Sequence, residues 1–289
     1  MPRLEVLKTY KMYIGGQFPR TESARYYALA DKKGNTIANI CLGSRKDFRN
    51  AVEAARKAFG EWSGKTAYNR SQIIYRIAEM MEGRKSQFVD ELVLQGLTSA
   101  KAVTEVSQAI DLIVYYAGWA DKYQQIYSSV NPVASKHFNF SYPEATGVVS
   151  IIAPERPSLL GLVDAVIPCI TGGNACIVLA SESQPLGAVT FAEVLATSDL
   201  PGGVINIITG TRKELLAQFA SHMDVNAIIY YGADKAEIKA VQENATLNVK
   251  RAIIRGGIGT PGPELINDTL ETKTTLAPCW VLIVRVRKE

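Results

Sequence analysis

Short, strongly apolar runs alternate with amphipathic stretches from residue 144 to residue 232. The first run, GVVSIIAP at 147–154, has apolar residues or glycine at six of eight positions and ends in proline. Such a run is typical of a strand buried on both faces of a parallel sheet. Similar runs lie at 175–179, 204–210 and 225–230, the last ending at Gly232.

The segments between these runs have the character of helices and turns. A mostly apolar segment at 159–170 precedes the turn TGGN at 171–174. Amphipathic helices are predicted at 185–196, which ends at the Leu-Pro-Gly-Gly of 200–203, and at 213–221. Strands alternating with helices indicate an α/β fold with a doubly wound, mainly parallel sheet. Ligands of such sheets bind at the carboxyl ends of the strands.

The N-terminal third is mostly helical by pattern. Residues 11–18 are expected to form a strand and a glycine turn, with 36–41 as the partner strand. Helices are predicted at 46–62, 69–82, 85–95 and 101–127. The last helix carries aromatic residues at helical spacing, namely Tyr115, Tyr116, Trp119 and Tyr123. They could form an aromatic ligand box, but core or interface packing is the favoured interpretation.

Two further segments read as β-structure. Residues 131–143 alternate, with Phe138, Phe140 and Tyr142 on one face, and predict a hairpin. Residues 280–286 form a nearly continuous apolar run, which predicts a strand. An unpaired strand of this kind would invite aggregation, so we expect it to pair. A Gly/Pro-rich linker at 256–264 separates the helical body from this tail.

Composition narrows the function classes. The chain of 289 residues is 47% hydrophobic and 21% charged, with a net charge of +4 from 32 basic and 28 acidic residues. The basic residues form no block, so nucleic acid is not an expected partner. No apolar run is long enough to cross a membrane, and the N-terminus lacks an apolar signal core. The four cysteines and two histidines have no metal-ligand spacing, and reduced thiols favour the cytoplasm.

A series of motifs along 144–232 resembles the cofactor-binding domain of the aldehyde dehydrogenase superfamily. The matching positions occur in the family's order and without a gap. They are Gly173-Asn174, Ser181-Glu182, Pro185-Leu186, the Gly-Val-Ile-Asn of 203–206, Thr209-Gly210, His222 and Gly232. The resemblance covers nearly all of residues 5–256. Within the superfamily, LKTYKMYIGGQFPRTESARYY near the start and the segments SESQPL and AEVLATSDLPGGV are similar to the degenerate second half of family 16 members.

The resemblance implies a domain organisation. Residues 1–130 and 144–256 would form the Rossmann-like unit of cofactor-binding type, and 131–143 with 271–289 an oligomerisation arm and tail. The family's catalytic domain, which carries the nucleophilic cysteine, has no counterpart here. Residues 257–270 would be a linker in its place. The excision is physically plausible because that domain is an insertion between the cofactor unit and the tail.

The resemblance also implies that the catalytic roles are vacant. Aldehyde oxidation needs a thiolate, an oxyanion donor and a base. The family's tryptophan and oxyanion asparagine align with Glu155 and Arg156, and its general-base glutamate falls near Arg255, whose guanidinium cannot act as a base. Neither Cys169 nor Cys176 lies in the nucleophile's setting. Both are expected to be small buried hydrophobes. No catalytic residue and no metal ligand is therefore assigned.

The cofactor residues of the family are only partly retained. The lysine that holds the adenosine ribose aligns with Leu179, and the serine that binds the pyrophosphate aligns with Ala233. Glu182, Gly210 and Gly232 remain as candidate cofactor-binding residues. A glutamate after a strand can equally be an ordinary surface residue. No bound cofactor is therefore the favoured expectation, with NAD or NADP as the alternative.

Two functions of different classes follow. The first is a structural or regulatory subunit that assembles with itself or with a catalytic aldehyde dehydrogenase. The second is an NAD(P)-binding oxidoreductase component that acts on aldehydes together with a partner chain. Both predict a cytoplasmic oligomer, with no nucleic acid and no membrane as partner. Dinucleotide titration separates them.

Overall fold

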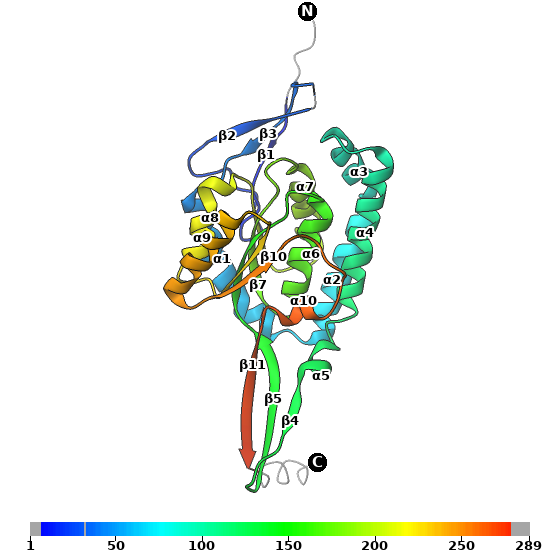
Figure 1. Ribbon diagram of the computed structural model, residues 1–289. Coiled ribbons are helices and arrows are strands. Elements are labelled where there is room, and N and C mark those ends of the chain that lie inside the picture. The colour runs from blue at the N-terminus through cyan, green and yellow to red at the C-terminus, as the bar shows by residue number, and fades with distance from the viewer. Residues whose placement is uncertain (1–6, 32, 279–289) are drawn as a thin grey trace, which may run out of the picture.

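A five-stranded parallel sheet forms the centre of the protein. The computed structural model describes residues 7–31 and 33–278 (Figure 1). The strands are β6 (Val148–Ile152), β7 (Ala175–Leu179), β8 (Ile205–Ile208), β9 (Ala227–Tyr231) and β10 (Arg251–Arg255). Their order is β10-β9-β6-β7-β8, and every neighbouring pair is parallel. The predicted α/β doubly wound sheet is confirmed, with β10 as a strand beyond the four predicted from the pattern.

Helices cover both faces of this sheet (Figure 1). One face carries α1 (Arg45–Gly64), α8 (Arg212–Ser221) and α9 (Lys235–Ala245). The other carries α6 (Ser158–Thr171) and α7 (Leu186–Leu195), with α2 (Ala67–Glu82), α3 (Lys85–Leu94) and α4 (Ser99–Ala117) packed outside them. Side chains of a strand alternate between faces. Accordingly Val149 and Ile151 belong to one core cluster, and Val148 and Ile152 to the other.

Residues near the start of the described chain form a second, three-stranded sheet. Its strand pairing differs from one prediction. It consists of β1 (Thr9–Tyr10), β2 (Tyr26–Ala30) and β3 (Thr36–Cys41) in the order β1-β3-β2. The expected partner of β3 was the segment 11–18, but β3 pairs with β1 and β2 instead. The backbone of Tyr13 bonds to Ile207 on the edge of the central sheet, so the segment 11–18 is occupied elsewhere.

A three-stranded antiparallel arm projects from the body (Figure 1). It holds β4 (Ser129–Asn131), β5 (His137–Ala145) and β11 (Leu270–Pro278), with β5 in the middle. The expected hairpin is present, and its rings stack along one face: the centroids of Phe138 and Phe140 lie 5.4 Å apart and those of Phe140 and Tyr142 lie 5.8 Å apart. The strand predicted at 280–286 lies outside the described residues.

Two segments differ from the pattern. The helix expected at 101–127 stops at Gly118, and a short helix α5 (Tyr123–Tyr127) follows. The segment 257–270 is not plain linker, since it contains α10 (Glu264–Asn267) and the first residue of β11. A 3₁₀ turn, η1, spans Thr246–Asn248. No helix within the described residues is both long and apolar enough to cross a membrane.

The aromatic residues around Gly118 serve mainly to pack helices. Tyr116 and Tyr123 are fully buried, and Tyr116 donates a hydrogen bond to the carbonyl of Gly262 at 3.2 Å. Tyr115 is 37% exposed and packs edge-on against Tyr116. The favoured packing interpretation is confirmed for the two buried tyrosines.

Candidate functional site

The carboxyl edge of the central sheet is the place where the fold would hold a ligand. The chain runs outward from β6 to β7 and β8, then returns to place β9 on the other side of β6. In a parallel sheet, the point where the strand order reverses in this way leaves a crevice, which lies beyond the carboxyl ends of the strands. Here it is bordered by residues 153–156, 180–183 and 209–212, and by Gly232. The three predicted cofactor-binding residues all follow strands of this edge.

Glu155 ties the loop after β6 to the loop after β7. Its carboxylate accepts hydrogen bonds from the hydroxyls of Ser181 and Ser183, each at 2.9 Å. It also accepts from the backbone N–H groups of Glu182 and Ser183, each at 3.2 Å. Burial works against ionisation, but these bonds outweigh it and hold the pKa of Glu155 below its usual value. Glu155 is therefore a partly buried anion with protein partners already in place.

Arg212, at the start of α8, spans the same edge. Its Nη2 donates to the carbonyl of Ala153 at 2.5 Å, and its Nε lies 3.4 Å from Oε1 of Glu155. Its Nη1 lies 3.9 Å from Oε2 of Glu237 on α9. The hydroxyl of Tyr230 donates to that same Glu237 oxygen at 2.5 Å. The guanidinium thus links the end of β6 to α9, and its side chain is only 17% exposed.

The predicted cofactor residues are placed around this network. Glu182 is half-buried, and its backbone, rather than its side chain, makes the bonds: its carbonyl accepts from the hydroxyl of Tyr27 at 3.2 Å. At Gly210 a Cβ would come within 3.1 Å of Leu215, so this glycine permits close packing of the loop. At Gly232 a Cβ would lie 2.5 Å from the hydroxyl of Tyr230. The two glycines therefore have a structural reason in this chain, whereas none of these contacts requires a glutamate side chain at position 182.

The structure also shows the two positions at which the family resemblance implies the loss of a contact to the cofactor. Leu179 is buried at the end of β7, and Ala233 is exposed just before α9. Neither side chain can donate a hydrogen bond. Arg212 and Glu237 were not among the predicted site residues. A cation two residues after Gly210, at the start of a helix, was the only sequence signal for Arg212.

A second buried cluster surrounds Arg255, which stands near the family's general base. Its Nη1 donates to the hydroxyl of Tyr231 at 2.7 Å, and its Nη2 donates to Asp268 at 2.7 Å. Tyr231 in turn donates to Oδ2 of Asp164 at 2.8 Å. The arginine is fully engaged in holding β10, α6 and the segment before β11 together. Arg156, aligned with the oxyanion donor, is exposed.

The cysteines at the predicted positions lie in the core. Cys169 is 1% exposed and Cys176 is fully buried. Burial, reinforced by the neighbouring Cys169 thiol, raises the pKa of Cys176 well above its usual value. A raised pKa disfavours the thiolate, which is the nucleophilic form. The prediction that both cysteines are small buried hydrophobes is confirmed.

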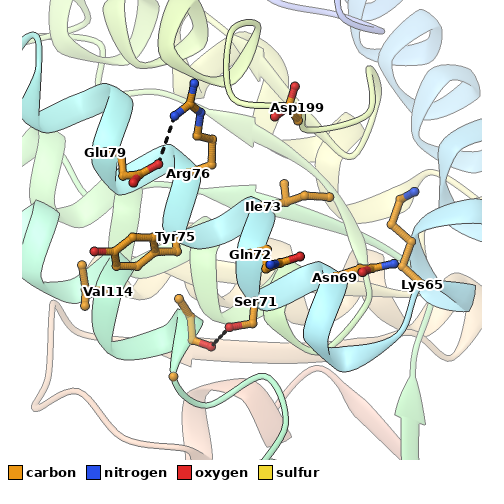
Figure 2. Close-up of a pocket in the computed structure, with 12 residues that line it drawn as sticks. Lys65, Asn69, Ser71, Gln72, Ile73, Tyr75, Arg76, Glu79, Val114 and Asp199 are labelled. Atoms are coloured by element: carbon orange, nitrogen blue, oxygen red, sulfur yellow. Dashed lines mark hydrogen bonds and ion pairs between the residues drawn. The ribbon is translucent and has the colours of Figure 1, made fainter.

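A separate groove lies away from this edge, along the outer side of α2 (Figure 2). It has a volume of about 860 Å³. Its charged side chains pair with one another, as Arg76 does with Glu79 at 3.1 Å, and Ser71 donates to the carbonyl of Ala117 at 2.8 Å. None of the predicted site residues lines this groove. No cysteine lines it.

Known proteins of similar sequence belong to a family that has this fold. A sequence model of the aldehyde dehydrogenase family matches residues 19–260. The chain is 28% identical over 265 residues to the cytosolic 10-formyltetrahydrofolate dehydrogenase of Mus musculus, which covers 90% of this chain and 29% of that protein. It is 30% identical over 259 residues to the mitochondrial benzaldehyde dehydrogenase of Antirrhinum majus, which covers 87% of this chain and 47% of that protein.

Solved structures give the same result. The lactaldehyde dehydrogenase of Escherichia coli superposes with a TM-score of 0.82 at 23% identity, covering 86% of this chain and 52% of that one. An NAD⁺ complex of an aldehyde dehydrogenase from Bacillus cereus gives a TM-score of 0.81 at 24% identity, covering 85% of this chain and 50% of that one. The chain therefore spans about half, or less, of the length of the proteins that it matches.

Proposed function

Because the chain belongs to the aldehyde dehydrogenase family, we propose that it is a catalytically incomplete member with a structural or regulatory role. One observation carries this proposal: charged side chains at the carboxyl edge of the sheet are already bound to one another. Arg212 bridges Glu155 and Glu237 there, with Tyr230 bonded to Glu237. A dinucleotide in this crevice would have to break that network or bind outside it.

The state of the catalytic positions supports the same proposal. The thiols of Cys169 and Cys176 are buried, which separates them from any aldehyde. Arg255 stays cationic and is bonded to Tyr231 and Asp268, so it supplies no base. Covalent aldehyde oxidation needs an accessible thiolate and a base together. All three cysteines among the described residues are buried, so none of them offers an accessible thiolate at this edge.

Assembly through the arm is part of the proposal. Three apolar side chains of the arm face solvent, with exposed fractions of 69% for Val130, 37% for Phe138 and 53% for Leu276. Exposed apolar side chains on a projecting sheet favour burial against another chain. We therefore propose a homo-oligomer, or a hetero-oligomer with a catalytic aldehyde dehydrogenase, in the cytoplasm.

The division of the chain follows the same logic. The Rossmann-like unit would comprise 1–130 and 144–256, and the arm and tail 131–143 and 271–289. Residues 257–270 stand where relatives would continue into a catalytic domain. In support, this segment bonds closely to the unit it leaves, through Arg255 to Asp268 and through Tyr116 to Gly262.

The second candidate is an NAD(P)-binding component that acts on aldehydes with a partner chain. Family membership favours it, as does the NAD⁺ complex of the Bacillus cereus relative. Glu182 is half-buried at the carboxyl edge of the sheet, and its carboxylate could bind a ribose hydroxyl. Leu179 and Ala233 weigh against it, because they offer no cation and no hydroxyl.

An activity assay tests the first candidate. The purified chain is incubated with NAD or NADP and a panel of aliphatic and aromatic aldehydes, and cofactor reduction is followed by absorbance. No turnover above the protein-free control is expected. A turnover that disappeared in a Cys169→Ala or Cys176→Ala variant would overturn the proposal.

A further inference from the structure

A groove of about 580 Å³ lies on the opposite side of α6 from the sheet, between α4 and the loop after β10. Its walls are largely apolar and come from Leu112, Tyr115, Leu160, Ile258 and Pro261. The hydrogen bond from Tyr116 to the carbonyl of Gly262 fixes the loop that closes one side. The groove shares no residue with the crevice around Arg212.

A buried carboxylate lies at this groove. Asp164 lines it, although the residue is only 1% exposed. Its Oδ2 accepts the hydrogen bond from Tyr231, but its Oδ1 has no partner among the described residues. A buried carboxylate oxygen without a donor carries a substantial free-energy cost. The other polar side chains of the groove belong to Gln108, Asp111 and Tyr115, and all three residues are exposed.

The charged groups around Asp164 carry a net negative charge. Arg255 is the nearby cation, but its charge is matched by Asp268 at 2.7 Å. Tyr116 and Tyr231 are neutral donors or acceptors. Asp164 therefore keeps an unmatched negative charge when ionised, and Asp111 adds another at the rim. Burial raises the pKa of Asp164, which is consistent with a carboxylate short of stabilising partners.

We propose that this groove binds a small primary alkylamine, with its ammonium group donating to Oδ1 of Asp164 and its alkyl chain lying against Leu112 and Leu160. An ammonium supplies both the charge and the N–H donor that Oδ1 lacks. A quaternary ammonium supplies only the charge. The apolar walls favour an alkyl body over a polar one. This site does not depend on the role proposed for the carboxyl edge.

Calorimetric titration with pentan-1-amine tests the site. Pentan-1-ol is the matched neutral probe and tetramethylammonium is the cation without a donor. The wild-type chain should bind the amine and give no measurable heat with the other two. Asp164→Asn should weaken amine binding by about tenfold or more, since a charge-assisted bond is lost. Asp90→Asn is the control and should retain binding, because Asp90 is exposed on α3 and does not line the groove.

Leu160→Trp gives an independent check that leaves the carboxylate intact. The larger side chain narrows the groove and should abolish amine binding, with circular dichroism confirming the fold. If Asp164→Asn failed to fold, this variant would decide the question. The proposal is overturned if the wild-type chain does not bind the amine at millimolar concentration. It is equally overturned if the alcohol binds as well as the amine, or if Asp164→Asn or Leu160→Trp binds like the wild type.

Discussion

Arg212 determines what the carboxyl edge of the sheet can accommodate. Its guanidinium compensates the carboxylates of Glu155 and Glu237, which would otherwise repel each other and any phosphate. The same side chain thus links both carboxylates and the end of β6. Gly232 contributes to this state because a Cβ there would meet the Tyr230 hydroxyl that bonds Glu237.

Replacing Arg212 by alanine tests this role at the level of one residue. Two partly buried carboxylates lose their cation, so we expect a loss of about 2 kcal/mol in the free energy of unfolding. Urea denaturation followed by circular dichroism measures it. Lys213→Ala, at the exposed neighbouring position, is the matched control and should stay within about 0.5 kcal/mol of wild type. Equal effects in the two variants would contradict the account.

Lys250 gives a prediction of pH dependence. Desolvation lowers its pKa from 10.5 to about 8, and its Nζ donates to the carbonyl of His222 at 2.9 Å. Between about pH 8 and 10.5 the unfolded chain binds more protons at this lysine than the folded chain does. The contribution of Lys250 to stability therefore rises as the pH increases through that window.

A Lys250→Met variant isolates this effect. At pH 7 the variant avoids a buried charge and should be more stable than wild type by roughly 1–2 kcal/mol, after the lost hydrogen bond is subtracted. The advantage should shrink as the pH rises above 8. Thermal unfolding of both proteins across this range measures the difference, with Lys239→Met on the exposed side of α9 as control. A constant difference at all pH values would refute the lowered pKa.

At the level of elements, helix α6 depends on a cap supplied by another helix. Its own N-cap residue is Pro157, which makes no side-chain cap. Instead Oε1 of Glu105 on α4 accepts from the N–H groups of Leu159 at 2.9 Å and Leu160 at 3.3 Å. A carboxylate at a helix N-terminus is also favoured by the helix dipole. This contact joins the outer helical layer to the helix that covers the sheet.

Truncating Glu105 to alanine should cost about 1–2 kcal/mol of stability, because two buried N–H groups lose their acceptor. Glu105→Gln keeps an acceptor oxygen and should lose less. Chemical denaturation of the two variants provides the comparison. Gln108→Ala, one helical turn further along α4 and exposed, should be close to neutral. If the alanine and glutamine variants had the same free energy of unfolding, the hydrogen bonds from α6 to the Glu105 side chain would contribute nothing to stability.

Four of the five strands of the central sheet were predictable because their signal is local, whereas β10 carries a charged residue at each end and was missed. Runs such as 148–152 and 175–179 are apolar at nearly every position, a pattern typical of strands that are buried on both faces of a parallel sheet. Strand β2 was missed because YYALA is largely exposed, with Tyr26 at 63%, and carries no buried pattern. The break of the long helix at Gly118 was missed because apolar spacing continues across it.

The candidate site was less predictable than the fold. Glu182, Gly210 and Gly232 follow from positions in motifs, and the resemblance located the edge. The pairing of Arg212 with Glu155 and Glu237 joins residues far apart in sequence, so it depends on the packed fold. The orphaned oxygen of Asp164 likewise arises only once β9, β10 and α6 are in contact.

At the level of the whole molecule, the arm lies largely outside the hydrophobic core of the body, to which its described strands contribute only Leu270. The chain pairs β11 with the full length of β5, so residues distant in sequence build one sheet that projects from the body (Figure 1). The stacked rings of Phe138, Phe140 and Tyr142 give this sheet an aromatic face. A second chain could bury that face and extend the sheet at its edge.

Deleting residues 277–289 tests assembly through the arm. We expect the full-length chain to run as an oligomer in light scattering and the truncated chain to run as a monomer. Circular dichroism should show that the truncated chain keeps its helices and central sheet. A buried Trp or Phe contributes on the order of 2–3 kcal/mol, which is enough for a shared aromatic face to hold a dimer. A monomeric full-length chain at high micromolar concentration would contradict self-association, and co-expression with a full-length relative would follow.

Calorimetric titration of the purified full-length chain with NAD and with NADP is the decisive test of the proposed function. Arg212 is paired with Glu155 and Glu237 at the carboxyl edge, and Leu179 and Ala233 donate nothing to a dinucleotide. Loss of one charge-assisted contact alone weakens binding by about tenfold or more. The account predicts no saturable heat with either dinucleotide at micromolar concentration. A micromolar dissociation constant would contradict it and favour the dinucleotide-binding component instead.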